Sequence, residues 1–221
     1  MQTVNYQLKH KLISNEYKPA YKLARKIFGN LEGRVLDYGC GIGKSSRLLI
    51  KWGAGSVLGV DSDETALDRA KRYKNNGIEY RLISKNDLSD VDGHFAAAFS
   101  SFVTVEISTK DELKRMANAI YDKLVSGGTY IMIAHNEDAV PYESPMISIR
   151  GVNGFNNQSG QQLDVEVRTS PPMYFRDYYW KITDYKEVLE NVGFKIEEIS
   201  TAKPEEGKDI SPFIVIKAIK E

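Results

Sequence analysis

The feature that most constrains the fold is a glycine-rich turn joining an apolar segment to an amphipathic one. The apolar run Arg34–Tyr38 predicts a strand, and the apolar spacing within Lys44–Lys51 predicts a helix. Between them, glycine occupies alternate positions at Gly39, Gly41 and Gly43. Glycine lets a backbone turn sharply and approach a ligand closely, and the helix that follows offers free amide groups. In a parallel sheet flanked by helices, this turn lies at the ligand-binding crevice.

The same alternation of strand and helix continues along most of the chain. Strands are predicted at Arg34–Tyr38, Ser56–Val60, Ile78–Ile83, His94–Ser100, Thr129–Ala134, Phe194–Ile199 and Pro212–Ile219. Helices are predicted at Asn15–Phe28, Lys44–Lys51, Asp63–Lys74, Lys110–Leu124 and Thr183–Asn191, where Thr183 is the expected N-cap. Short strands separated by helices predict an α/β domain with a doubly wound parallel sheet.

One segment interrupts this pattern. This segment spans residues 136–180, and its part Asn136–Pro172 is rich in proline, glycine, asparagine and serine. It contains an alternating stretch at Leu163–Val167 and an extended stretch at Met173–Trp180, which together predict a small hairpin insertion. We therefore expect a single domain over residues 1–221, with this insertion on its surface.

Composition narrows the functional class. The chain has 30 basic and 30 acidic residues, so it lacks the cationic excess with which nucleic-acid-binding proteins neutralise phosphates. Its one cysteine, Cys40, cannot form an internal disulfide, and no apolar run reaches the length of a membrane span. The polar N-terminus has no secretory pattern. These features predict a cytoplasmic protein without nucleic-acid or membrane partners, and they leave its oligomeric state open.

Three ligands compete for the glycine-rich turn. The phosphate-loop pattern ends in Gly-Lys-Ser, as at residues 43–45, but it needs a glycine where Tyr38 stands. The dinucleotide pattern needs glycine or alanine where Lys44 or Ser46 stands, which disfavours a nicotinamide-dependent reductase. The third ligand has an adenosine but no phosphate at the turn, and the carboxylate of Asp37 would suit its cationic amino group.

The segment Asp37–Gly43 matches every fixed position of the signature Asp/Glu-x-Gly-x-Gly-x-Gly. At this point the chain resembles the class I S-adenosylmethionine-dependent methyltransferases, and the resemblance runs in order from Val35 to Ala134. It implies a Rossmann-like fold with a seven-stranded, mostly parallel sheet and an antiparallel last strand. It also implies S-adenosylmethionine as the cofactor, with S-adenosylhomocysteine as the product.

The resemblance assigns cofactor contacts to the ends of four strands. It implies that an acid after the second strand holds the ribose hydroxyls, that residues after the third strand contact adenine, and that residues after the fourth lie beside the sulfonium. The implied cofactor-binding residues are Asp37, Gly39, Cys40, Gly41, Gly43, Asp61, Ser62, Asn86, Asp87, Leu88, Ser100, Phe102 and Tyr17. Cys40 is expected to pack rather than to act as a nucleophile, and no metal site is expected.

The acceptor is expected beneath residues 1–30, a helical lid, and residues 136–180, a substrate cap. His135 follows the fifth strand and is the candidate general base, the alternative being a histidine that only hydrogen-bonds the insertion. The expected substrate-binding residues are Asn136, Tyr21, Tyr174, Tyr178 and Tyr179, with core packing as the alternative role for the tyrosines.

The expected function is methyl transfer to a nitrogen or oxygen atom of a small molecule. The acceptor-amine motif Asp/Asn-Pro-Pro-Tyr/Phe is absent after the fourth strand, where Ser100–Val103 stands, and this disfavours methylation of DNA adenine or glutamine. The alternative is a catalytically inactive, methyltransferase-like protein that binds the cofactor and acts as a regulatory partner.

Overall fold

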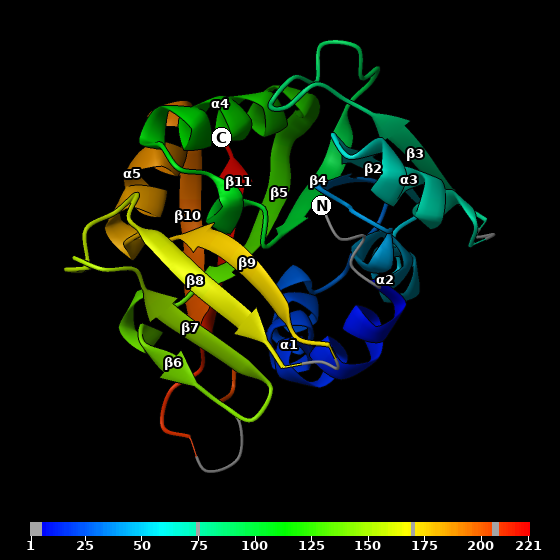
Figure 1. The fold of residues 1–221 in the computed structure, drawn as a ribbon. Coiled ribbons are helices and arrows are strands. Elements are labelled where there is room, and N and C mark those ends of the chain that lie inside the picture. The colour runs from blue at the N-terminus through cyan, green and yellow to red at the C-terminus, as the bar shows by residue number, and fades with distance from the viewer. Residues whose placement is uncertain (1–5, 74–75, 169–170, 205–207) are drawn as a thin grey trace.

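The structure, a computed structural model, describes residues 6–73, 76–168, 171–204 and 208–221, with only the backbone described for residues 6–16. Its main element is a seven-stranded sheet with the order β10-β11-β5-β4-β1-β2-β3 (Figure 1). The strands are β1 (Arg34–Tyr38), β2 (Ser56–Asp61), β3 (Ile78–Leu82), β4 (Phe95–Ser101), β5 (Leu124–His135), β10 (Phe194–Thr201) and β11 (Phe213–Lys220). Strands β1 to β5 pair in parallel, whereas β11 is antiparallel to both of its neighbours. The predicted doubly wound fold with an antiparallel last strand is confirmed.

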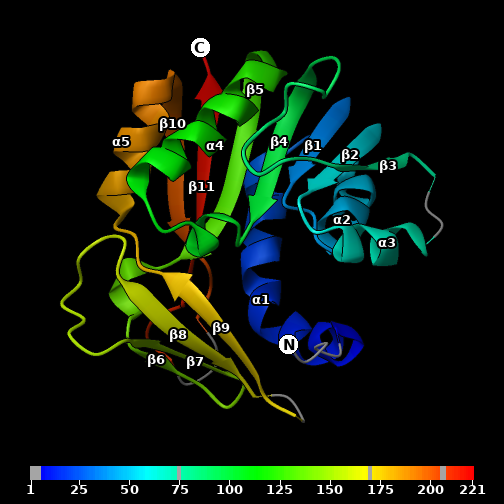
Figure 2. The same ribbon diagram turned by 45° about the horizontal axis from the view of Figure 1, so that its top comes forward.

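Helices cover both faces of this sheet (Figure 2). They are α1 (Tyr6–Phe28), α2 (Lys44–Trp52), α3 (Glu64–Lys71), α4 (Lys110–Lys123) and α5 (Ile182–Val192), with a short 3₁₀ turn η1 at Thr104–Glu106. Buried side chains of α1 and α2 pack in one apolar cluster, and those of α4 and α5 pack in a second cluster across the sheet. None of the described helices has the length and apolarity needed to cross a bilayer.

Several predicted boundaries differ from the structure. Helix α1 begins at Tyr6 rather than Asn15, and the i, i+4 spacing of Leu8 and Leu12 is the sequence signal for this earlier start. Helix α5 begins at Ile182 with Lys181 at its N-cap, so Thr183 does not cap it. Strand β5 begins at Leu124, directly after α4, rather than at the predicted Thr129. The predicted end of the third helix, Lys74, lies outside the described residues.

The insertion is larger than the predicted hairpin. It contains a 3₁₀ turn and a four-stranded antiparallel sheet, which we call the cap sheet. Its elements are η2 (Glu137–Ala139), β6 (Tyr142–Glu143), β7 (Ile147–Gly151), β8 (Gln162–Val167) and β9 (Met173–Tyr178), in the order β6-β7-β8-β9. Strands β8 and β9 form the predicted hairpin. Figure 2 shows the cap sheet next to α1, beyond one end of the central strands.

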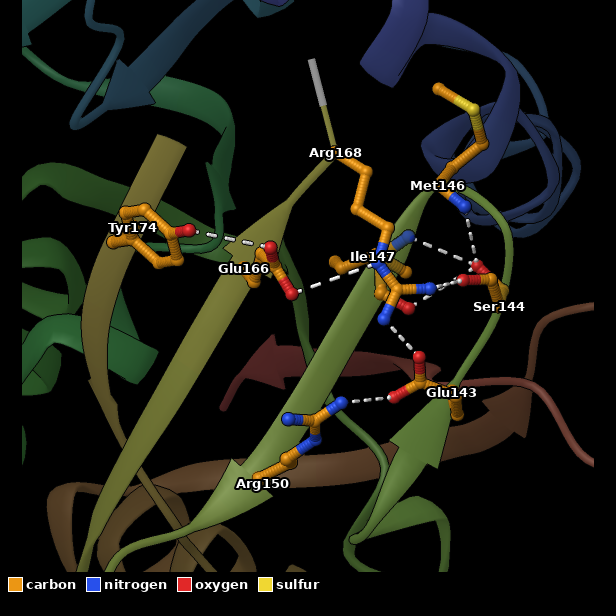
Figure 3. Close-up of polar contacts among 8 residues, drawn as sticks. All are labelled: Glu143, Ser144, Met146, Ile147, Arg150, Glu166, Arg168 and Tyr174. Carbon is orange, nitrogen blue, oxygen red and sulfur yellow. Dashed lines mark hydrogen bonds and ion pairs between the residues drawn. The ribbon is translucent and has the colours of Figure 1, made fainter. Parts of the chain in front are cut away.

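The two faces of the cap sheet differ in chemistry. Leu163, Val165 and Val167 are buried and pack toward the core. On the outer face, Glu143 forms ion pairs with Arg150, at 3.0 Å, and with Arg168 (Figure 3). Such exposed pairs contribute little stability individually. Because successive side chains of a strand point to opposite faces, the apolar residues of β8 all face the interior of the protein.

Candidate active site

The glycine-rich turn adopts a backbone that side chains would obstruct. Gly39, Gly41 and Gly43 all have positive φ, at 69°, 52° and 74°. A Cβ atom at Gly39 would collide with Val103, whereas one at Gly41 would meet no atom within 4 Å. The amides of Gly39 and Cys40 donate to the carbonyl of Val60, which ties the turn to the end of β2. The turn therefore leaves open space at its middle glycine.

Asp37 lies beneath this turn, fully buried. Its Oδ2 accepts hydrogen bonds from the hydroxyls of Ser45 and Ser46, at 2.7 and 2.5 Å. Its Oδ1 has no hydrogen-bond partner among the described residues. Burial, reinforced by the charge of Asp61, raises the pKa of Asp37 to about 6, although the two serine bonds oppose this shift.

The second carboxylate stands at the end of β2. Oδ2 of Asp61 accepts the amide hydrogen of Gly41 at 2.7 Å, and its Oδ1 accepts that of Asp63 at 2.9 Å. Asn86, which has a positive φ of 60°, accepts from the hydroxyl of Tyr38 at 2.9 Å. These bonds hold polar groups from the ends of three strands around the glycine-rich turn.

These groups open into a cavity of about 410 Å³. The predicted residues that line it are Tyr17, Tyr21, Gly39, Cys40, Gly41, Asp61, Ser62, Asn86, Phe102 and His135. Burial, with the charges of Asp37 and Asp61, raises the pKa of the Cys40 thiol far above its usual range. The cavity therefore contains most of the residues expected around the turn, and Cys40 remains protonated there.

His135, the last residue of β5, lies at the cavity wall beside the cap sheet. Its Nε2 is 2.7 Å from Oδ2 of Asp177 on β9, and the two side chains are only 7% and 12% exposed. Its Nδ1 is buried and has no hydrogen-bond partner among the described residues. The rings of Phe102 and Phe213 lie near it, with centroid separations of 6.5 and 6.1 Å. His135 thus both bonds the insertion and faces the cavity.

Helix α1 contributes two aromatic rings to the cavity. Tyr17 packs against Phe102, with centroids 4.6 Å apart. The hydroxyl of Tyr21 lies 2.8 Å from Oγ of Ser101, and burial raises the pKa of Tyr21 to about 12. The Nζ of Lys44 lies 5.1 Å from the centre of the Tyr21 ring, and burial lowers the pKa of this lysine. A position in the first turn of a helix suggests a solvated side chain. Lys44 is instead partly buried at the cavity wall.

Other predicted cofactor-binding residues lie outside the cavity wall. Ser100 points to the opposite face of the sheet, where its hydroxyl bonds that of Tyr130 at 2.8 Å. Asp87 is exposed and accepts from the amide of Ser89, and Leu88 is buried in the core. Gly43 caps α2, and Asp37 is covered by its two serines.

Most of the predicted substrate-binding residues also lie outside the cavity wall. Asn136 is buried and donates to the carbonyl of Ser211 at 2.9 Å. Tyr174 is 71% exposed on the outer face of the cap sheet, where its hydroxyl donates to Glu166 (Figure 3). Tyr178 and Tyr179 pack into the two apolar clusters.

Several cavity residues were not predicted: Lys44, Ser101, Glu106, Val165, Phe175 and Asp177. Ser101 follows Ser100 directly, and strand alternation, which sends neighbouring side chains to opposite faces, was the available signal. Asp177 lies within the extended stretch Met173–Trp180, where no sequence pattern distinguishes it from the neighbouring aromatic residues. Within the described residues, no group of three His, Cys, Asp or Glu side chains is placed to hold a metal ion.

Sequence comparison shows which known proteins this chain is similar to. Residues 35–128 match the family model described as a methyltransferase domain. Over 163 residues, the chain is 25% identical to N-demethylindolmycin N-methyltransferase of Streptomyces griseus, covering 72% of this chain and 68% of the relative. Over 125 residues, it is 33% identical to ribosomal RNA small subunit methyltransferase C of Shewanella amazonensis, covering 55% of this chain but only 36% of the relative.

Solved structures share the whole fold. An S-adenosylmethionine-dependent methyltransferase from Clostridium acetobutylicum superimposes with a TM-score of 0.70 at 17% identity, covering 97% of each chain. The glycopeptide N-methyltransferase MtfA, solved with S-adenosylhomocysteine, gives 0.69 at 12% identity, covering 93% of this chain and 90% of that one. The domain match, strand order and glycine-rich turn define a Rossmann-like methyltransferase. Residues 35–128 therefore form a methyltransferase domain, and the chain as a whole is similar in fold to S-adenosylmethionine-dependent methyltransferases.

Proposed function

We propose that the protein transfers a methyl group from S-adenosylmethionine to a nitrogen or oxygen atom of a small molecule. The observation that carries this proposal is a single cavity whose wall includes Gly41 and Asp61 as well as His135 and Asp177. Both the main sheet and the cap sheet contribute to it. A cavity of about 410 Å³ with mixed aromatic and polar walls suits an enclosed small molecule.

The residues around the turn fit the methyl donor. Asp61 presents a carboxylate that can accept hydrogen bonds from two neighbouring ribose hydroxyls, and the open space at Gly41 admits close approach of a ligand. Asn86 offers amide groups suited to a base edge. The unpartnered Oδ1 of Asp37 lies beneath the same turn, where it would favour a cationic amino group. When bound, the donor supplies a methyl group already activated by the sulfonium.

The acceptor would lie between α1 and the cap sheet, which act as a lid and a substrate cap. Tyr17, Phe102 and Phe175 provide aromatic walls, and His135 with Asp177 provides the polar group. The names of two relatives, which act on N-demethylindolmycin and on a glycopeptide, support a nitrogen acceptor. The protein's task is then mainly to bring acceptor and methyl group together in line.

Calorimetry tests the donor. The full chain should bind S-adenosylmethionine and S-adenosylhomocysteine and show no heat with NADH. Binding of NADH alone would overturn the proposal. A low-molecular-weight metabolite extract and ribosomal RNA, each incubated with S-adenosylmethionine labelled in its methyl group, then test the acceptor. We expect label in the extract, whereas label confined to the RNA would refute a small-molecule acceptor.

The same assay separates the enzyme from an inactive, cofactor-binding regulatory protein. The opening of the cavity onto His135 supports turnover, because it leaves space beside a group that can accept a proton. Tight binding of the cofactor without label transfer to any fraction would support the regulatory alternative. The buried, unpaired thiol of Cys40 is consistent with our proposal of a cytoplasmic location.

A further inference from the structure

The pair His135–Asp177 joins the main sheet to the cap sheet at the cavity. His135 ends β5, Asp177 lies on β9, and both side chains contribute to the cavity wall. The 2.7 Å separation of Nε2 and Oδ2 is that of a strong hydrogen bond. The pair therefore assembles only when the cap sheet is in place on the core.

The chemistry of the pair dictates where the hydrogen lies. An ionised carboxylate only accepts hydrogen bonds, so Nε2 of His135 must carry the hydrogen that it donates to Asp177. In the neutral ring, Nδ1 then keeps its lone pair. This atom is buried and unpartnered among the described residues, and an unpaired buried acceptor is costly unless a ligand satisfies it.

We propose that Asp177 is a positioning residue that fixes His135 in the tautomer with hydrogen on Nε2, so that Nδ1 accepts the proton lost by the methyl acceptor. This inference rests on the proposed function. It also narrows the substrate class, because the atom that is methylated must carry a hydrogen, as in a hydroxyl, an amine or an amide.

The transfer balances in atoms and charge. The lone pair of the acceptor forms the new bond to the methyl carbon, and the electron pair of the broken carbon–sulfur bond stays on sulfur. The hydrogen of the acceptor goes to Nδ1 of His135 as a proton. The carboxylate of Asp177 then stabilises the resulting imidazolium, which lies beside the rings of Phe102 and Phe213.

Nitrogen NMR of the full chain labelled in its histidines tests the tautomer directly. The chain has three histidines, and the variant His135→Gln identifies the signal of interest. In the wild type at neutral pH, with and without S-adenosylhomocysteine, we expect hydrogen on Nε2 and a pyridine-type signal for Nδ1. Asp177→Asn should move hydrogen to Nδ1 or mix the tautomers, and Asp177→Glu should restore the wild-type pattern.

Asp164→Asn, on the exposed face of neighbouring β8, is the matched control and should leave the His135 signal unchanged. Hydrogen on Nδ1 in the wild type, or an unchanged spectrum in folded Asp177→Asn, would overturn the inference. Calorimetry with S-adenosylhomocysteine on the same samples keeps the two proposals apart. If the wild type does not bind S-adenosylhomocysteine, the proposed function is refuted, whereas the tautomer result bears on Asp177 alone.

Discussion

The hydroxyl of Tyr21 lies 2.8 Å from Oγ of Ser101, and this bond fastens helix α1 to the end of β4 at the cavity. Because burial raises the pKa of Tyr21 to about 12, the phenol stays protonated at neutral pH. The bond therefore connects two segments that are 80 positions apart in the chain.

A double-mutant cycle measures this connection. Tyr21→Phe and Ser101→Ala should each lower the free energy of unfolding, with a coupling energy of about 0.5–1.5 kcal/mol for the shared hydrogen bond. Urea unfolding of the four proteins gives this value. Tyr174→Phe, at an exposed tyrosine, should change stability by no more than about 0.5 kcal/mol. Strictly additive effects of the two cavity substitutions would show that the bond contributes nothing.

Asp61 is expected to dominate cofactor affinity. Its carboxylate stands at the end of β2 and receives the amide hydrogen of Gly41. Asp61→Ala should weaken binding of S-adenosylhomocysteine by about 1–3 kcal/mol, because charge-assisted hydrogen bonds are lost. Calorimetry checks this, with Asp68→Ala on the exposed side of α3 as a control that should bind normally. Equal affinities of the two variants would remove Asp61 from the site.

Gly39 combines two constraints that substitution can separate. Its φ is 69°, and an added Cβ would collide with Val103, whereas Gly29 has φ 67° and nothing within 4 Å of such an atom. Gly29→Ala should therefore cost only the left-handed strain of about 1–2 kcal/mol. Gly39→Ala should cost more and also weaken cofactor binding. Thermal unfolding and calorimetry test both, and an equal loss of stability in both variants would contradict the crowding.

Asp37 should make the cofactor-free protein sensitive to pH. Burial raises its pKa to about 6 from the usual 3.8, so its contribution to stability is complete below about pH 3.8. That contribution is lost as the pH rises through about 6, because the folded state must then ionise a buried group. The expected loss is at most about 1.4 kcal/mol for each pH unit in this window.

Asp37→Asn should lack this loss and unfold at higher urea than the wild type above pH 6. Its stability should change less between pH 4 and pH 6 than that of the wild type, in urea titrations at matched ionic strength. Asp68→Asn, at an exposed acid, should follow the wild type. Parallel pH profiles for Asp37→Asn and the wild type would show that Asp37 does not take up a proton on folding.

The glycine-rich turn and Asp61 could be predicted because their evidence is local. A strand, three glycines and a helix follow one another directly, and the acid stands at the next strand end. Ser101 illustrates a limit of such evidence: a shift of one residue exchanges the faces of a strand, so Ser100 contacts Tyr130 on the far side of the sheet. The exact end of β4 decided which serine faces the cavity.

The cap sheet could be predicted only in part for a different reason. The alternating segment Ile147–Gly151 forms β7, but it is short and stands among turn-forming residues. The contact between His135 and Asp177 depends on how the cap sheet docks, and the two residues are 42 positions apart. No local sequence pattern predicts this pair, because only tertiary packing brings the two residues together.

Kinetics provide the last test of this pair. With an acceptor identified by the label-transfer assay, His135→Gln should lower kcat by about 10²–10⁴-fold, the usual contribution of a general base. Asp177→Asn should cause a loss of similar order through the wrong tautomer, with affinity for S-adenosylhomocysteine within about threefold of the wild type. Because the residues act as a unit, the double variant should be little slower than the slower single variant. Multiplicative losses, or an effect on KM alone, would show that Asp177 does not act through His135, and Asp164→Asn should keep the wild-type rate.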